Sequence, residues 1–201
     1  MSAAPIALEH GASLARLTTI GTGGPARALG RPRTVDDLTA ALRWATVGLG
    51  SNLLVADLGV EMLVLRLERE LAAATAEGTL LRAGGGASNA VCLHRARDAG
   101  LGGLEFACAI PGTAGGGTRM NAGAYGSDWA AILERALVVT ADGEEWRTPA
   151  QLDLSYRHSA LEVGEVVALV EYRLQPRPVA EIRAEVAELI ARRKATQPTT
   201  R

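Results

Sequence analysis

The chain has 201 residues, of which 48% are hydrophobic, and its formal net charge at pH 7 is −1. This hydrophobic share supplies a buried core, which excludes a disordered chain. The near-neutral charge argues against a protein that binds nucleic acid or a membrane surface. The N-terminus shows no signal-peptide pattern, and no apolar run approaches the ~20 residues that a membrane span needs.

The two cysteines, Cys92 and Cys108, have no metal-ligand spacing. We therefore expect no metal site. A reduced pair of thiols in a cytoplasmic protein is the default interpretation, and a disulfide is the less favoured alternative.

The first third of the chain predicts one helix and several short strands. Thr34 has the side chain of an N-cap, and an amphipathic helix is predicted over 35–45. A short strand over 46–47 then runs into a glycine-containing turn, and further strands are predicted over 53–56 and 62–67.

The remainder of the chain mixes strands and helices without a regular alternation. The predicted elements are a strand over 79–83, a helix over 89–99 capped by Ser88 and ended by Gly100, a strand over 133–140, a hairpin turn at Asp142-Gly143 with a return strand over 144–147, a strand over 165–174, and a helix over 179–193 opened by Pro178. This order indicates an α+β protein with mixed strands. The dinucleotide fingerprint and the P-loop are both absent, since no GxGxxG follows the first strand and no GK[ST] occurs.

Residues 109–126, reading AIPGTAGGGTRMNAGAYG, are the most informative stretch. Neither an amphipathic helix nor an alternating strand is predicted through them. A segment so dense in glycine exposes its backbone N–H groups and is typical of loops that bind phosphate. Pro111 stiffens the entry, and Asn121 and Tyr125 are the side chains large and polar enough to orient a ligand. The alternative is a flexible surface loop.

A second glycine turn, GLGSN at 48–52, is predicted to lie between two strands. Successive N–H groups in such a turn point at one spot, which suits a pyrophosphate, and Ser51 and Asn52 add side-chain donors. Alone, this segment is more simply an ordinary tight turn. Together with residues 109–126 it predicts two backbone clamps on one large anionic ligand.

Arg157, within LSYRHS, is a candidate for holding a carboxylate or stabilising a developing enolate. From the local sequence alone, a solvent-facing arginine is the simpler interpretation. His158 is a candidate acid or base by residue type only. Ser155 and Ser159 lack the setting of a hydrolase nucleophile. The cations Arg192-Arg193-Lys194 suit the end of a helix, and a phosphate contact there is an alternative.

Four segments together resemble the UDP-N-acetylenolpyruvoylglucosamine reductase family, flavoenzymes of peptidoglycan precursor synthesis. They are LTTIGTGGPA at 17–26, GLGSNLLV at 48–55, the stretch from GGLEF at 102–106 through IPG at 110–112 to NAGAYG at 121–126, and SYRHS at 155–159. The order of the GSN, IPG…NAGAYG and YRxS motifs is highly specific to that family.

The resemblance implies an α+β fold of the two-subdomain, FAD-binding, vanillyl-alcohol-oxidase (PCMH) type. Subdomain 1 would cover 1–67 and subdomain 2 would cover 68–178, and 179–201 would form a helix leading to a C-terminal substrate domain that we expect this chain to lack. It implies FAD and NADPH as cofactors, a UDP-sugar as substrate, and Arg157 as the catalytic residue that stabilises an enolate. The cofactor-binding residues it implies are Gly48, Leu49, Gly50, Ser51, Asn52, Leu53, Ile110, Pro111, Gly112, Gly115, Gly116, Asn121, Gly123, Ala124 and Tyr125.

Three departures from the family qualify these expectations. The segment that carries the family's proton-donating serine is expected beyond residue 201, the strand before Gly48 is short, and Thr196 stands where relatives often carry lysine. An NADPH-dependent reductase is therefore one interpretation. A flavin-binding module without activity is the alternative, and a decayed gene product without function is a third.

Overall fold

The computed structural model describes residues 6–41 and 45–197. Its first part is a four-stranded sheet in the order β1-β2-β4-β3, formed by β1 (Leu8–His10), β2 (Ala26–Gly30), β3 (Ala45–Thr46) and β4 (Val60–Leu65). β1 pairs antiparallel with β2, whereas β4 pairs parallel with both β2 and β3. The sheet is therefore mixed, as predicted.

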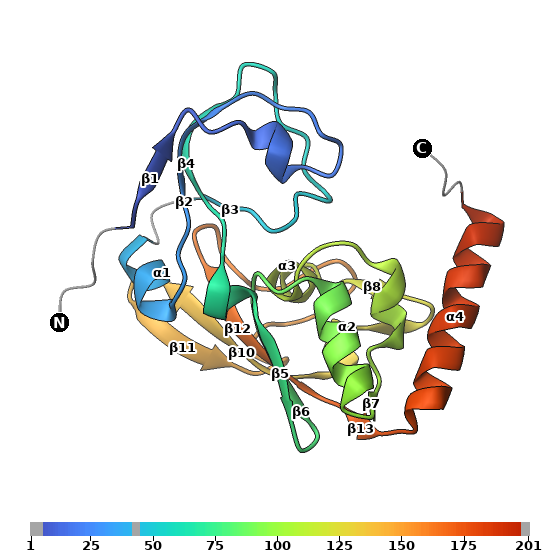
Figure 1. Ribbon diagram of the computed structural model, residues 1–201. Coiled ribbons are helices and arrows are strands. Elements are labelled where there is room, and N and C mark those ends of the chain that lie inside the picture. The colour runs from blue at the N-terminus through green and yellow to red at the C-terminus, as the bar shows by residue number, and fades with distance from the viewer. Residues whose placement is uncertain (1–5, 42–44, 198–201) are drawn as a thin grey trace.

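The second part is a five-stranded antiparallel sheet in the order β11-β10-β12-β6-β5. Its strands are β5 (Ala74–Glu77), β6 (Leu80–Gly84), β10 (Leu133–Thr140), β11 (Gly143–Arg147) and β12 (Val166–Arg173). The central strands β10 and β12 carry continuous apolar runs at 136–139 and 166–170, where both faces of the sheet are covered (Figure 1).

The helices are α1 (Val35–Ala41), α2 (Asn89–Asp98), α3 (Ala114–Arg119) and α4 (Val179–Thr196). Two small pairs complete the fold: β7 (Leu101–Gly102) with β13 (Gln175–Pro176), and β8 (Gly123–Ala124) with β9 (Ser127–Asp128). Short 3₁₀ turns span Leu14–Leu17, Arg69–Ala72, Glu105–Ala109 and Trp129–Ala131. Among the described residues, no helix is both long and apolar enough to cross a membrane.

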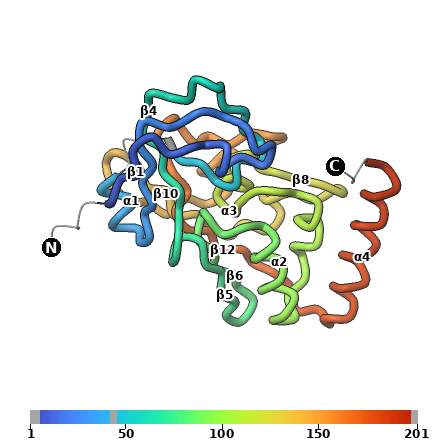
Figure 2. Tube along the Cα trace, turned by 45° about the horizontal axis from the view of Figure 1, so that its top comes forward, coloured from blue at the N-terminus to red at the C-terminus, as the bar shows by residue number. Residues whose placement is uncertain are grey.

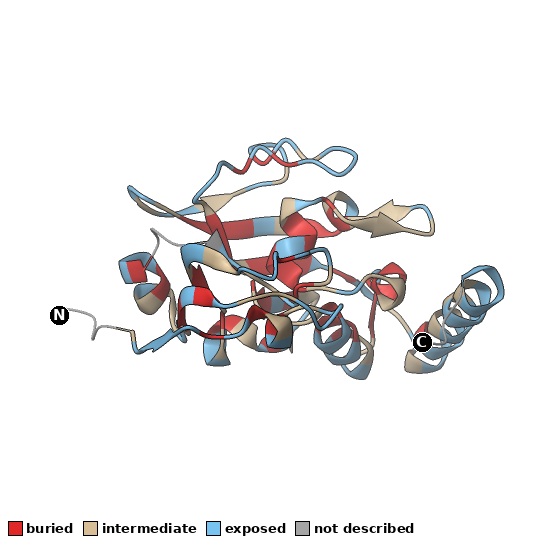
Figure 3. Ribbon diagram, turned by 90° about the horizontal axis from the view of Figure 1, so that it is seen from above, coloured by how far each residue is buried: buried red, intermediate tan, exposed pale blue. Residues whose placement is uncertain are grey.

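The core lies on both faces of the five-stranded sheet (Figure 3). One face packs against α2 and α3, with Trp129, Tyr172 and Phe106 at its centre. The other face packs against Leu38 of α1 and Leu65 of β4, so the two sheets are joined by a common apolar layer. α4 lies along one edge of the molecule beside β8, and of its described side chains only Ile182 is buried (Figures 1 and 2).

Local capping signals in the sequence are confirmed. The Thr34 hydroxyl accepts from the Asp37 N–H at 3.1 Å, while the Asp37 carboxylate accepts from the Thr34 N–H at 3.3 Å, which is a capping box. Ser88 caps α2 through the Val91 N–H, and Gly100 follows the helix with φ +67°.

Other expectations are corrected. The helix predicted over 35–45 is described to Ala41, residues 42–44 lie outside the described residues, and Ala45 already belongs to β3. Residues 53–56 form no strand, since they pair with no strand of either sheet. β1, β2 and β5 were not predicted, because their short segments alternate too little to stand out.

The prediction that no helix passes through the glycine-rich stretch is wrong, because α3 occupies it. Thr113 caps α3 by accepting from the Gly116 N–H at 3.3 Å. A Cβ on Gly115 would lie 2.9 Å from the Gly85 carbonyl oxygen, and one on Gly117 would lie 2.7 Å from the Trp129 ring. The glycines therefore let α3 pack directly against backbone and indole, a contact that an amphipathic pattern cannot signal.

The four-stranded sheet uses residues within 1–67 and the five-stranded sheet uses residues within 68–178. These limits agree with the order of the two predicted subdomains, but the boundaries themselves stay predictions.

Candidate functional site

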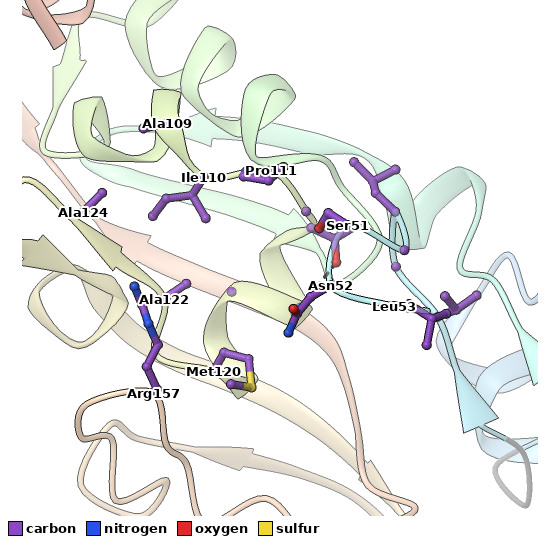
Figure 4. Close-up of a pocket in the computed structure, with 18 of the residues that line it drawn as sticks. Ser51, Asn52, Leu53, Ala109, Ile110, Pro111, Met120, Ala122, Ala124 and Arg157 are labelled. Carbon is purple, nitrogen blue, oxygen red and sulfur yellow. Dashed lines mark hydrogen bonds between the residues drawn. The ribbon is translucent and has the colours of Figure 1, made fainter. Parts of the chain in front are cut away.

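A cavity of about 980 Å³ lies between the four-stranded sheet and the α3 side of the second part. Its walls come from residues 46–55, from β4, from residues 109–125, from Arg157 and from the last turn of α4. Ligand pockets typically measure about 300–1,000 Å³, so this cavity has room for a large cofactor. Ser51, Asn52 and Leu53 lie on one side of it, and Ile110, Ala124 and Arg157 lie on the other (Figure 4).

The turn at 48–52 turns its carbonyls back into the protein. Thr19 donates from its N–H to the Gly50 carbonyl oxygen at 3.2 Å and from its hydroxyl to the Leu49 carbonyl oxygen at 3.4 Å. Within the described part of the chain, the N–H groups of Gly48 to Asn52 donate no hydrogen bond to protein. They are therefore available to an anionic ligand in the cavity.

Gly50 makes this turn possible. Its φ is +59°, and a Cβ at this position would lie 2.0 Å from the Leu17 carbonyl oxygen. The turn follows a strand, β3, but leads into an extended segment without strand pairing, so the predicted strand–loop–strand arrangement holds on one side only. The close approach of Gly50 to the Leu17 carbonyl fixes the turn against the segment before β2.

The second predicted clamp, residues 109–126, offers fewer free N–H groups than expected. The N–H groups of Ala114, Gly115 and Gly116 bond to Ala87, Gly85 and Thr113 respectively. These three N–H groups stabilise the fold through hydrogen bonds and are not free for a ligand. Gly116 still lines the cavity, whereas Gly115 lines a smaller neighbouring cavity of about 260 Å³.

Asn121 is buried and engaged with protein. Its amide donates to the Ser155 carbonyl oxygen at 3.0 Å and to Asp128 Oδ2 at 3.3 Å, and its Oδ1 accepts from the Ala130 N–H at 2.9 Å. Its side chain thus ties two loops together, and its predicted role in orienting a ligand stays a prediction.

Tyr125 lines the cavity, but its hydroxyl donates to the Leu189 carbonyl oxygen of α4 at 3.0 Å. Its ring lies under the Arg192 guanidinium, 5.7 Å from the centroid. The Tyr125 hydroxyl is therefore engaged by α4, and its predicted role in orienting a ligand stays a prediction.

Arg157 lies on a tight turn closed by paired hydrogen bonds between Ser155 and His158. Its φ is +56°, and its Nη2 donates to the Gly123 carbonyl oxygen at 3.0 Å. Arg157 lines the cavity and forms no salt bridge with a described carboxylate. A cation held by a neutral carbonyl can receive the negative charge of a ligand.

The remaining candidates near Arg157 have other roles. The Ser159 hydroxyl is nearly buried and donates to the Arg119 carbonyl oxygen at 2.6 Å, so it is structural.

Both cysteines are free, and burial raises the pKa of Cys92 to about 12. Among the described residues no cluster of side chains fits a metal ion, and Cys92 offers no reactive thiolate.

The apolar wall of the site and the role of Asn89 were not predicted, whereas Arg193 was named among the cations at the end of the last helix. Val60, Met62 and Val64 of β4 line the cavity beside Leu53, although the strand itself was predicted. Asn89 and Arg193 bond to residues 109–112. The residue after the Ser88 cap and the cations at the end of the last helix were the available signals for them.

The donor set fits a flavin dinucleotide. A row of free N–H groups at 48–52 suits a pyrophosphate, the apolar wall of Leu53 and Met62 suits an aromatic ring, and Arg157 suits an electron-rich atom or a carboxylate. A Cβ on Gly48 would lie 2.9 Å from Thr113 Oγ1, so glycine keeps the cavity open where the two walls meet.

Comparison with known proteins supports this interpretation. Residues 26–149 match the FAD binding domain family. A UDP-N-acetylenolpyruvoylglucosamine reductase from Rhizorhabdus wittichii is 44% identical over 95% of this chain and 65% of its own length. The chain thus spans about two thirds of the length of such curated relatives.

Two solved structures extend the comparison. The UDP-N-acetylenolpyruvylglucosamine reductase from Thermus caldophilus superposes with a TM-score of 0.85 at 35% identity, covering 96% of this chain and 71% of that one. A VAO-type flavoprotein from Myceliophthora thermophila superposes at 0.55 with 19% identity, covering 75% of this chain and 32% of that one. The second likeness shows the fold alone, and it confirms the predicted α+β fold of the vanillyl-alcohol-oxidase type.

Proposed function

The chain belongs to the UDP-N-acetylenolpyruvoylglucosamine reductase family, and from that membership we propose that it binds FAD as part of an NADPH-dependent reductase. The substrate is UDP-N-acetylglucosamine enolpyruvate and the product is UDP-N-acetylmuramate, a precursor of peptidoglycan. We expect this reaction to take place in the cytoplasm. The predicted alternative, a flavin-binding module without activity, is not favoured by the named relatives.

One observation carries the proposal: the five consecutive residues from Gly48 to Asn52 line a cavity of about 980 Å³, and their N–H groups bond to no described residue. They would hold the pyrophosphate of FAD. Leu53 and Met62 would cover one side of the cofactor, and residues 110–112 with Gly123 and Ala124 would cover the other. The contribution of Gly116 is close backbone approach, because its N–H is already bonded to Thr113.

The chemistry needs a flavin, which when bound supplies hydride transfer from NADPH to the enolpyruvyl group. Arg157 would meet the negative charge that builds on the substrate carboxylate, and it is already oriented by the Gly123 carbonyl oxygen. The turn from Ser155 to His158 holds this cation at the cavity wall, and Asn121 fixes that turn through the Ser155 carbonyl.

The test begins with the purified 201-residue chain. We expect a flavin absorption spectrum, or uptake of added FAD with quenching of flavin fluorescence. A chain that takes up no FAD at high micromolar concentration would overturn the proposal. Activity is then assayed after joining the chain to the C-terminal domain of a relative, as NADPH oxidation that depends on the enolpyruvyl substrate. Flavin binding without any such turnover would support the module alternative.

A further inference from the structure

The segment 109–112, which we call the IPG loop, is held by donors from two helices. Arg193 Nη1 of α4 donates to the Ala109 carbonyl oxygen at 2.8 Å. The Asn89 side-chain amide of α2 donates to the Ile110 carbonyl oxygen at 3.1 Å, and the Asn89 N–H donates to the Gly112 carbonyl oxygen at 3.0 Å. Three of the four carbonyls of a cavity-lining loop are therefore fixed from outside the loop.

Asn89 makes this contact from a rigid position. It is the first residue of α2, directly after the Ser88 cap, and its exposed fraction is 1%. Its Oδ1 has no hydrogen-bond partner among the described residues, so burial of this side chain carries a cost in stability. Its one side-chain hydrogen bond among the described residues goes to the IPG loop. The buried Asn89 side chain therefore orders this loop at a cost in stability.

Arg193 makes its contact from a helix with few apolar anchors. The C-terminal half of α4 is held to the body through the Tyr125 hydroxyl on the Leu189 carbonyl, the Arg192 guanidinium over the Tyr125 ring, and the Arg193 bond itself. The Arg193 bond therefore belongs to both sets of contacts, because it holds this half of α4 and the IPG loop together.

Fixing the carbonyls also fixes the groups offered to the cavity. The Gly112 carbonyl and the Thr113 N–H share one planar peptide unit and point in opposite directions. The Asn89 bond to Gly112 thus sets the direction of the Thr113 N–H, which bonds to no described residue. Both Ile110 and Thr113 line the cavity, with the Ile110 side chain on the Arg157 side (Figure 4).

We propose that Arg193 and Asn89 are positioning residues, which act through the IPG loop to set the affinity and orientation of the flavin; this rests on the proposed binding of FAD. Arg193 in addition couples the end of α4 to the flavin site. Neither residue needs to touch the reacting atoms for this role. Arg193 is the better target for mutation, since it is only half-buried at the end of a helix.

The experiment compares Arg193→Ala with Arg193→Lys and with Arg183→Ala, whose arginine is exposed on the same helix. Loss of one charged hydrogen bond to the loop is expected to weaken FAD binding by roughly tenfold or more in Arg193→Ala. Lysine should recover part of the affinity, and Arg183→Ala should bind like the wild type. The visible circular dichroism of bound flavin should change in Arg193→Ala alone.

Hydrogen exchange on the FAD-free proteins gives a second readout. The peptide containing Ile110, whose N–H donates to the Ala107 carbonyl oxygen at 3.0 Å, should exchange faster in Arg193→Ala than in Arg183→Ala. Equal FAD affinity and equal exchange in the two variants would overturn the positioning role while leaving FAD binding intact. A fall in melting temperature with unchanged affinity would overturn it as well, because that is the signature of a purely structural contact. If the wild-type chain binds no FAD, the proposed function fails first and this inference falls with it.

Discussion

Arg157 and Gly123 are joined by a hydrogen bond of 3.0 Å, from the guanidinium Nη2 to the carbonyl oxygen. The two residues come from segments 34 positions apart in the sequence. Their contact brings the YRxS turn to the NAGAYG segment on one wall of the cavity. One of the two terminal guanidinium nitrogens donates to this carbonyl oxygen. Because a neutral carbonyl does not neutralise the cation, the positive charge of Arg157 stays available to a ligand.

Arg157→Ala should abolish turnover in a protein that joins this chain to a relative's C-terminal domain. Removing one preorganised donor typically costs about 10²–10³ in rate. FAD binding should persist, because the proposed pyrophosphate donors lie in the separate turn at 48–52. Arg173→Ala is the control, since Arg173 is exposed and pairs with Glu134. Substrate-dependent NADPH oxidation near the wild-type rate would remove Arg157 from the catalytic role.

Much of the fold is predictable from local signals. Ser88, Gly100 and the Asp142-Gly143 turn each mark the end of an element, because capping and turn chemistry is written in adjacent residues. β10 was predicted over the residues it occupies. What failed is α3, whose helical state depends on Gly115 and Gly117 meeting distant backbone and indole, and no local pattern carries that information.

The residues of the site also fall into two groups, those that the local sequence predicts and those that only the folded chain brings together. The turn at 48–52 and Arg157 were predicted from their residue types and motifs, and both line the cavity. The role of Asn121 was missed because an asparagine in a glycine-rich loop has the same local pattern whether it faces a ligand or, as here, ties Ser155 to Asp128. Asn89 and Arg193 reach the IPG loop across 21 and 84 positions of sequence, a separation that only the folded chain reveals.

Gly50→Ala should prevent FAD binding and lower stability more than Gly78→Ala does. The two glycines have nearly equal φ, +59° and +57°, so the backbone strain of an alanine is matched. A Cβ at Gly50 would lie 2.0 Å from the Leu17 carbonyl oxygen, whereas one at Gly78 would meet nothing within 4 Å. Thermal melts and FAD titrations of both variants measure the difference. Similar behaviour of the two would show that the Leu17 contact does not shape the turn.

Tyr172→Phe should destabilise the chain by about 1–3 kcal/mol, because the buried indole N–H of Trp129 loses its acceptor. That N–H donates to the Tyr172 hydroxyl at 2.6 Å, and both side chains are fully buried. For a chain of this size the melting temperature should fall by roughly 2–4 °C per kcal/mol. The double variant Trp129→Phe/Tyr172→Phe removes both polar partners at once. A coupling of zero between the two substitutions would contradict a direct bond.

FAD should raise the melting temperature of the chain. Saturation at about 100 times the dissociation constant adds roughly 2.7 kcal/mol to the free energy of unfolding. Differential scanning fluorimetry with and without FAD checks this, with AMP as a control ligand that lacks the flavin ring. Equal melting temperatures with and without FAD would count against a folded-state site.

Glu171 should make stability depend on pH. The Arg135 hydrogen bond at 2.6 Å is the main cause of a lowered pKa for the Glu171 carboxyl, and Arg82 lowers this pKa further. A carboxyl whose pKa is lower in the folded state contributes stability above its unfolded pKa of about 4.3, and that stability is lost as the pH falls through the folded value. Glu171→Gln, which keeps the shape but not the charge, should therefore be less stable than the wild type at neutral pH.

The difference in unfolding free energy between Glu171→Gln and the wild type should shrink as the pH is lowered from about 7 to about 3, because protonation removes the same charge from the wild type. Urea titrations along that pH series measure it. Glu61→Gln, at an exposed position of β4, controls for the loss of one carboxylate from the surface. If the difference in unfolding free energy between Glu171→Gln and the wild type stayed constant over the whole pH range, the effect would be due to packing. The salt bridges of Glu171 with Arg82 and Arg135 would then contribute nothing to stability.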